Sequence, residues 1–261
     1  MFKEYDDFYF KVEIDEFNSK HFGLQMGNVT VCPIREKDFD EKNARAVAEA
    51  INCARQNGIQ HLSCRVDTSE KALARSFQQG GFQIVDTLVT YCFRFEESKL
   101  PQVDSRCELR DWREDDIPQL RTIAGASFRM GRFHSDPALS DDLCDQYYEQ
   151  WFENSCHGLA DKVTVACVDD TPIGFATAVC PREGEYARMG LIAVSEAARG
   201  RGVGAALELE MLRWSKKQIP QRPKMQGFLH GTQIDNLAMQ RILGRMNFLM
   251  HTSQYVFHCT I

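Results

Sequence analysis

The residues best suited to binding chemistry form a glycine-rich hexad, Arg199-Gly200-Arg201-Gly202-Val203-Gly204. It follows an apolar run, residues 189–194, and precedes an amphipathic segment, an order that predicts a strand, a tight loop and a helix. The first backbone N–H groups of a helix have no partner within it and lie at the positive end of its dipole. Glycines let an anion approach these groups and the two arginines add charge, so the pattern predicts a phosphate or pyrophosphate site.

Two other phosphate-binding patterns do not fit this loop. The chain has no GxxxxGK[ST] motif, and the alternating glycines at 200, 202 and 204 lack the last glycine of G-x-G-x-x-G. One alternative stays open, in which the glycines only form a turn between a strand and a helix.

The loop, written as Arg199-x-x-Gly202-x-Gly204 after a strand, resembles the acyl-CoA pyrophosphate loop of the GNAT N-acetyltransferase superfamily. Downstream, Asn236, a predicted helix over 237–246 and Phe248 resemble that family's following segments. The resemblance covers residues 108–261 and implies the GNAT fold, an α/β fold with a central mixed sheet flanked by helices, and acetyl-CoA as co-substrate. Backbone groups of the strand would hold the pantetheine arm. The implied cofactor-binding residues are Leu191, Ile192, Ala193, Val194, Arg199, Gly200, Arg201, Gly202, Val203, Gly204, Ala205 and Asn236.

Within the superfamily, segments 132–137, 148–155 and 255–257 resemble the dTDP-fucosamine acetyltransferases of bacterial surface-polysaccharide synthesis. This likeness implies a nucleotide-linked amino sugar as substrate. We expect residues 127–136 to form the substrate-side wall, in which Arg129 and Arg132 bind the phosphates, Phe133 stacks on the base or ring, and His134 belongs to the same wall. A solvated junction between a helix and a loop would have the same composition.

Acetyl transfer to an amine requires a neutral amine and a proton for the leaving thiolate. The position that usually carries the family's tyrosine falls on Leu243, and leucine cannot donate a proton. Tyr255, in the last predicted strand, and His230, near the end of a predicted strand over 226–232, are the substitute catalytic residues, with His230 suited to the role of base. Each also fits a packed, hydrogen-bonded structural residue.

Composition bounds the class of protein. The 261 residues are 43% hydrophobic and 26% charged, as in a globular chain of one large or two modest domains. A net charge of −6 argues against nucleic acid as a partner. No apolar run approaches the ~20 residues of a membrane span, and the acidic start, residues 1–7, is no signal peptide, so we expect a cytoplasmic protein without membrane contact. The ten cysteines form no CxxC pair, so we expect them to be reduced, mostly buried and not bound to a metal.

We expect the domain boundary in the polar stretch 96–106, between an N-terminal α/β domain, 1–100, and an acetyltransferase domain, 107–261. In the first half, 28–32, 59–66 and 82–95 predict strands, and 41–57 and 69–79 predict helices. The charge run 111–116 predicts a solvated helix start.

The two halves show a weak internal similarity. Aligning Phe82 with Phe248 places Ala72 on Ala238 and Arg75 on Arg241, and a small gap pairs residues 91–93 with 255–257. These matches indicate a degenerate half-repeat of the GNAT fold that has no glycine-rich loop and shapes the substrate cleft or packs a homodimer. Convergent strand-helix patterning is the alternative.

The sequence therefore predicts an acetyl-CoA-dependent N-acetyltransferase that acts on a primary amine, with a nucleotide-linked amino sugar as the first choice of substrate. The alternatives are another amine, such as a polyamine, an antibiotic or a protein α-amine, or a non-catalytic acyl-CoA-binding protein.

Overall fold

The computed structural model describes residues 1–4, 9–32 and 39–261, which form two compact units. The first unit contains Met1–Leu88, Gly131–Leu143 and Thr252–Ile261, and the second contains Val89–Met130 and Cys144–His251. Part of the predicted acidic start, 1–7, and the segment before the first long helix, 33–38, lie outside the described residues.

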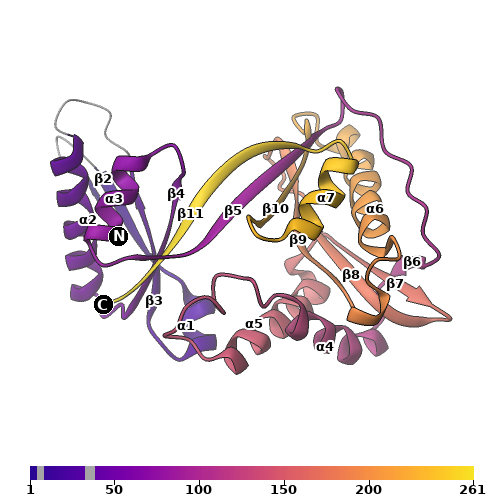
Figure 1. Ribbon diagram of the computed structural model, residues 1–261, viewed down its shortest axis with the longest axis horizontal. Helices are drawn as coiled ribbons and strands as arrows, with labels where there is room; N and C mark the ends of the chain where they lie inside the picture. Colours follow the sequence, from indigo (N-terminus) through magenta and orange to yellow (C-terminus); the bar gives the residue numbers. More distant parts are fainter. Residues whose placement is uncertain (5–8, 33–38) are drawn as a thin grey trace. The chain divides into compact units, whose positions relative to one another are not determined.

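The first unit is a mixed sheet with helices packed on it (Figure 1). Its described strands follow the order β1-β2-β3-β4-β11. β3 and β4 are parallel, and the other neighbouring pairs are antiparallel. The elements are β1 Phe2–Glu4, β2 Tyr9–Ile14, α1 Glu16–Phe22, β3 Met26–Val31, α2 Phe39–Gln56, β4 His61–Asp67, α3 Lys71–Gln79 and the end of β11, Leu249–Thr260.

The core of the first unit lies between its strands and α2. Apolar residues of α2 recur at intervals of one helical turn and form one buried face, which consists of Ala46, Val47, Ala50, Ile51 and Ala54. This face packs in one cluster with residues of β2, β4 and α3. Beyond the end of α2, Gly58 adopts φ +72°, a left-handed conformation that glycine accepts at low cost and that stops the helix.

The second unit has the strand order β10-β9-β8-β7-β6. β9 and β10 are parallel, whereas β6 to β9 are antiparallel. Helices α4 and α6 both contact β8 and β9 and lie on opposite faces of them (Figure 1). The elements are β5 Gln83–Arg94, β6 Glu108–Asp111, α4 Ile117–Ser127, α5 Asp141–Asn154, β7 Lys162–Val168, β8 Thr171–Val179, β9 Tyr186–Val194, α6 Val203–Lys217, β10 Gly227–Gln233 and α7 Leu237–Arg245.

The observed elements confirm the predicted α/β class. In the first half, the bounds differ from the predicted ones by at most two residues. The cysteines are also packed as predicted, since eight of them are buried and Cys32 and Cys107 are half-buried. None of the described helices is long and apolar enough to cross a bilayer.

The compact units differ from the predicted division into 1–100 and 107–261. Phe93 and Phe95, which precede the predicted second domain, belong to the apolar core of the second unit, where Phe93 packs against Phe248. Gly131–Leu143 and Thr252–Ile261, in turn, belong to the first unit. The reason is that β5 and β11 each contribute residues to both units, so no single cut in the sequence separates them.

The predicted solvated helix start at 111–116 is wrong for Asp116, which is 5% exposed. Arg110 donates to its two carboxylate oxygens at 2.7 and 2.8 Å, and the Arg113 N–H donates at 2.8 Å. The hydrogen bonds from Arg110 lower the pKa of Asp116 below its ordinary value. This buried pair joins β6 to the start of α4.

Two parts of the chain have the same order of elements, β3-α2-β4-α3-β5 and β9-α6-β10-α7-β11. The elements β10, α7 and β11 begin and end 166 residues after β4, α3 and β5, respectively. The first matching pair of bounds is His61 and Gly227, and the last is Arg94 and Thr260. This separation aligns Phe82 with Phe248 without a gap. The gap of the predicted alignment is therefore not needed, and Tyr91 corresponds to Phe257.

Candidate active site

The glycine-rich loop connects β9 to α6 as predicted. Gly200 and Gly202 adopt φ +75° and +79°, and Gly202 is the N-cap residue of α6. The first helical bond runs from the Ala206 N–H to the Gly202 carbonyl at 2.9 Å, so Val203, Gly204 and Ala205 have no N–H partner within the helix. α6 has neither a side-chain cap nor an acidic residue in its first turn. The start of this 15-residue helix therefore has the unsatisfied N–H groups and the positive dipole end that attract an anion.

β9, the strand that leads to this loop, contains a bulge. Ala176 pairs with Ile192 and Ala178 with Met189, so β9 has one extra residue opposite β8. Gly190 lies at the bulge, and a Cβ there would come within 2.4 Å of the Thr177 hydroxyl. The β9–β10 ladder pairs residues 186–188 with 227–229, whereas β9 continues to Val194. Residues 192–194 therefore have no partner in the described β9–β10 ladder.

A cavity of about 630 Å³ in the second unit combines these features. Its lining includes residues 192–194 of β9, residues 202–205 at the start of α6, and residues 101–104 of the polar segment before β6. Asn236, Ala238, Met239 and Ile242 contribute from the start and one face of α7. A strand edge and an uncapped helix start that share one cavity suit a ligand with an extended polar arm and a phosphate group.

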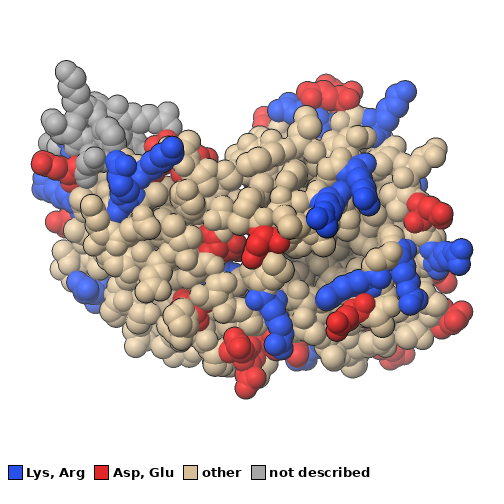
Figure 2. Space-filling view, viewed as in Figure 1, with Lys and Arg blue, Asp and Glu red and all other residues tan. Residues whose placement is uncertain are grey.

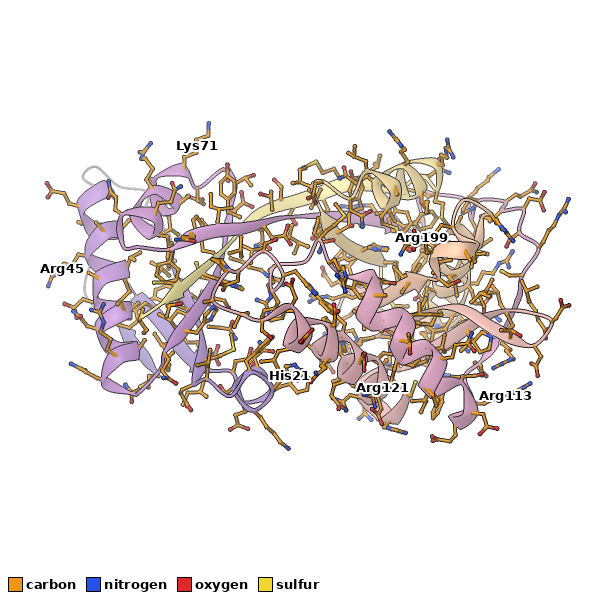
Figure 3. All side chains as sticks on the ribbon, turned by 60° about the horizontal axis from the view of Figure 1, so that its bottom comes forward. His21, Arg45, Lys71, Arg113, Arg121 and Arg199 are labelled. Atoms are coloured by element: carbon orange, nitrogen blue, oxygen red, sulfur yellow. The ribbon has the colours of Figure 1, made fainter. Side chains whose placement is uncertain are left out.

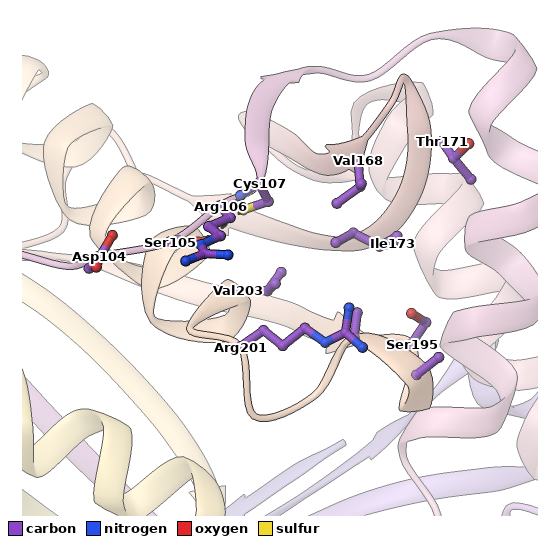
Figure 4. A pocket seen from close by; sticks show the side chains of 12 residues that line it. Asp104, Ser105, Arg106, Cys107, Val168, Thr171, Ile173, Ser195, Arg201 and Val203 are labelled. Atoms are coloured by element: carbon purple, nitrogen blue, oxygen red, sulfur yellow. Dashed lines mark hydrogen bonds between the residues drawn. The ribbon is translucent and has the colours of Figure 1, made fainter.

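Ten of the twelve residues implied as cofactor-binding line this cavity: Ile192, Ala193, Val194, Arg199, Gly200, Gly202, Val203, Gly204, Ala205 and Asn236. Leu191 does not line it, because its side chain is 3% exposed and its N–H donates to the Thr177 hydroxyl at 2.8 Å. Arg201 lines a neighbouring pocket of about 860 Å³, into which its side chain points beside Ser195 and Val203 (Figure 4). The two arginines of the loop thus face different cavities.

Arg199 is tied to the end of β9. Its Nε donates to the Val194 carbonyl at 3.2 Å, and it lies at the start of α6 (Figure 3). Both charge signs are interspersed on the face shown in Figure 2. At this loop, the N–H groups of the helix start and the Arg199 guanidinium are the groups suited to bind a phosphate.

The two glycines nearest the helix start have different roles. A Cβ at Gly202 would lie 2.6 Å from the Asp104 carbonyl oxygen and would require a left-handed φ, so glycine is needed there for the fold itself. A Cβ at Gly204 would meet only Ile242 Cδ1 at 3.4 Å and Val194 Cγ2 at 4.0 Å, which are ordinary contacts. Gly204 leaves space in the cavity, whereas Gly202 permits the turn.

Asn236 caps α7, since its side chain accepts from the Met239 N–H at 3.2 Å and donates to the Thr232 hydroxyl at 3.1 Å. Leu243, at the position of the family's tyrosine, is 0% exposed in the apolar core of the second unit. The residues of α7 that line the cavity are Ala238, Met239, Ile242 and Arg245. Leu243 is not among them and is packed in the apolar core instead.

His230, a predicted catalytic residue, lies on β10 and is 3% exposed. Its Nδ1 lies 2.7 Å from Oε2 of Glu208 on α6, and Glu208 is 0% exposed. A neutral imidazole that donates from Nδ1 to a carboxylate would have on Nε2 the lone pair that a base needs. His230 is not among the residues that line the 630 Å³ cavity.

Tyr255, the other predicted catalytic residue, belongs to the first unit. It pairs with Val66 in the β4–β11 ladder, is partly buried against the core of that unit, and contacts the ring of Phe257. The cavity described above belongs to the second unit.

The predicted substrate-side residues also fall in both units. Arg129, in the second, forms an exposed ion pair with Asp145 at 2.8 Å. In the first, the Arg132 guanidinium lies 4.4 Å from the centre of the Phe133 ring, and Phe133 itself is 2% exposed and packs against Phe22. His134 is half-buried. The ring of Phe133 is therefore part of a packed aromatic cluster.

Sequence reasoning missed the bulge and the contribution of residues 101–104. An isolated glycine within an apolar strand, here Gly190, is the signal that could have indicated the bulge. No local signal marks residues 101–104, because their place beside Gly202 depends on the tertiary structure.

Comparison with known proteins agrees with this geometry. The model of the acetyltransferase (GNAT) family matches residues 117–248. The chain is 27% identical over 143 residues to the spore coat polysaccharide biosynthesis protein SpsD of Bacillus subtilis. This alignment covers 55% of this chain and 47% of that protein. It is also 33% identical over 103 residues to a dTDP-fucosamine acetyltransferase of Escherichia coli. That alignment covers 39% of this chain and 43% of the relative. The chain thus spans about half the length of the curated relatives it matches.

A solved structure supports the two-part fold. A tandem GNAT protein from the clavulanic acid biosynthesis pathway superposes with a TM-score of 0.57 at 15% identity, covering 91% of this chain and 76% of that one. At this identity the likeness concerns the fold alone, and it agrees with the repeated order of elements described above. The match over residues 117–248 establishes that the chain belongs to the GNAT acetyltransferase family.

Proposed function

We propose that this protein binds acetyl-CoA in the 630 Å³ cavity and transfers the acetyl group to a primary amine. The observation that carries the proposal is the uncapped start of α6, which shares one cavity with the end of β9. Bound acetyl-CoA would supply the activated acetyl thioester. The N–H groups of Val203, Gly204 and Ala205, together with Arg199, would hold its pyrophosphate.

The chain's own residues have two tasks in this proposal. The backbone edge of residues 192–194 orients the extended arm of the cofactor, and a positioned base and acid handle the protons. His230, held by Glu208, is the proposed base, and Tyr255 is the proposed acid. An amine with a pKa near ~8 is about one-tenth neutral at pH 7, so the demand on the base is modest for such a substrate.

A nucleotide-linked amino sugar is the proposed acceptor. Support comes from the names of two relatives, one described as a dTDP-fucosamine acetyltransferase and one as a spore coat polysaccharide biosynthesis protein. Arg129, Arg132 and His134 are the polar residues proposed to bind it. Because Phe133 is 2% exposed, it would support the position of Arg132 rather than stack on the sugar or the base.

The test is the release of CoA thiol from acetyl-CoA in the presence of an amine panel: a TDP-linked amino sugar, the free amino sugar, a polyamine, an aminoglycoside and a peptide with a free α-amine. The proposal expects turnover with the nucleotide-linked sugar and a much lower kcat/KM with the free sugar. Turnover that is highest with another amine would replace the proposed acceptor. Acetyl-CoA binding without turnover on any amine would favour the alternative of a non-catalytic acyl-CoA-binding protein. The apolar Leu243 at the position of the family's tyrosine is the observation behind this alternative.

A further inference from the structure

Three side chains in the first unit converge at one buried point far from the glycine-rich loop in sequence. His61 begins β4, His258 lies in β11, and Asp136 belongs to the segment Gly131–Leu143. Their exposed fractions are 1%, 3% and 6%. Asp136 Oδ2 lies 2.7 Å from His61 Nε2 and 2.6 Å from His258 Nδ1.

The hydrogen bonds of this cluster leave capacity unused. The Asp136 carboxylate accepts from both rings and, through Oδ1, from the Ala138 N–H at 2.9 Å. The outer ring nitrogens, His61 Nδ1 and His258 Nε2, are buried and have no hydrogen-bond partner among the described residues.

Two neutral imidazoles and a carboxylate form a recurrent ligand set for divalent transition metals. One ligand atom from each residue lies within 4.8 Å of the others. Metal–ligand distances of about 2.0 to 2.2 Å place neighbouring donor atoms of a tetrahedral site about 3.3 to 3.5 Å apart. The two ring nitrogens now lie 2.7 and 2.6 Å from Asp136 Oδ2, so metal binding would require each of them to move away from that oxygen by less than about 1 Å. We propose that His61, Asp136 and His258 bind one divalent metal ion of the zinc type.

Metal coordination at His61 Nε2 and His258 Nδ1 requires any proton on those atoms to leave them. The outer nitrogens, His61 Nδ1 and His258 Nε2, have no hydrogen-bond partner among the described residues and can take these protons by a change of tautomer. With three protein ligands, a water molecule takes the fourth position.

Arg132 places a positive charge near the cluster, since its guanidinium lies 4.4 Å from the centre of the Phe133 ring and that ring centre lies 5.9 Å from the centre of the His258 ring. This charge would disfavour a cation at the cluster. Replacing Arg132 with glutamine should therefore tighten metal binding. Bound metal would also cross-link β4, β11 and the segment Gly131–Leu143, three parts distant in sequence, and raise the stability of the first unit.

The experiment titrates the full-length, chelator-treated protein with Co²⁺ and then displaces it with Zn²⁺. The proposal expects one Co²⁺ per chain, a d–d spectrum of a nitrogen and oxygen site without a thiolate-to-cobalt band, and a melting temperature that rises with metal concentration. The absence of the thiolate band matters because the chain has ten free cysteines. No saturable binding of either metal, or binding with thiolate bands, would overturn the proposal.

Two variants locate the ion. Asp136→Asn keeps the shape and should weaken affinity by about 100-fold or more, because it removes the one charged ligand. His251→Gln is the matched control, since His251 is exposed and belongs to the other unit, and it should bind as the parent does. Unchanged affinity in Asp136→Asn would overturn the assignment. Should that variant fail to fold, the NMR spectrum of the Co²⁺-bound parent replaces it. The proposal expects paramagnetically shifted imidazole N–H signals from two histidines, and a spectrum without them would overturn it.

Discussion

The two repeated parts of this chain, β3-α2-β4-α3-β5 and β9-α6-β10-α7-β11, differ more in their loops than in their elements. The elements β4, α3 and β5 have the same lengths as β10, α7 and β11, and each pair is separated by the same number of residues. Before α6, two glycines with positive φ lead to an uncapped helix start. Before α2, residues 33–38 read PIREKD, which contains no glycine and has two acidic and two basic residues. The glycine pattern of the loop before α6 is therefore absent from the sequence at this point.

The comparison extends to the residues proposed for chemistry. At the constant separation, His230 corresponds to Cys64 and Tyr255 to Val89, both of which are buried. At these positions the first part has Cys64, whose thiol pKa is raised well above its ordinary value by burial, and Val89, which has no titratable group. A shared scaffold with a ligand loop in only one copy fits the rule that function resides in loops placed by rigid elements.

The largest expected effect tests the proton-handling residues. His230→Gln keeps a donor for the buried Glu208 but removes the basic nitrogen, and Tyr255→Phe removes the phenol with little change of shape. Loss of a positioned acid or base should lower kcat by about 10²- to 10⁴-fold while the Kd for acetyl-CoA stays unchanged. Steady-state kinetics and CoA titration measure the two quantities. If both variants stay within a few-fold of the parent, neither residue does chemistry, and positioning alone accounts for catalysis.

A second prediction concerns the ion pair at β6, which lies in the second unit. Asp116→Asn should lower the free energy of unfolding at pH 7 by about 2 kcal/mol, because Arg110 loses its buried charged partner. The Asp116 pKa is depressed, so the stabilisation is present above the ordinary carboxyl pKa of 3.8 and is lost as the pH falls below it. Urea unfolding at pH 7, 4 and 3 should show the two proteins converging. A difference that is independent of pH would assign the effect to packing.

The two arginines of the loop provide a matched pair for a third prediction. Arg199→Ala should weaken acetyl-CoA binding by about 10- to 100-fold, because one charge-assisted contact contributes about 1.5 to 3 kcal/mol. Arg201→Ala should have a much smaller effect, since Arg201 lines the neighbouring pocket (Figure 4). Isothermal titration calorimetry at one salt concentration compares the two. The reverse order of effects would mean that the pyrophosphate lies on the Arg201 side of the loop.

Local patterns predict some parts of this molecule and not others. The loop, its strand and its helix follow from glycine spacing and apolar periodicity, and ten of the twelve implied cofactor residues share one cavity. The cluster of His61, Asp136 and His258 has no local pattern, because its members come from three distant segments. The burial of Phe133 and the pairing of Asp116 with Arg110 depend likewise on tertiary contacts that composition does not reveal.

The most direct test of the central claim, that the start of α6 binds the cofactor, is the Kd of Gly204→Val for acetyl-CoA. A valine at 204 would occupy space beside Ile242 and Val194 in the cavity, while the backbone stays in the helical region. We expect affinity to fall by about 100-fold, through loss of one or two charge-assisted contacts, with an unchanged melting temperature. Gly244→Val is the matched control, because nothing lies within 4 Å of a Cβ at that exposed position of α7, and it should bind as the parent does. Parental affinity in Gly204→Val would contradict the assignment of the loop.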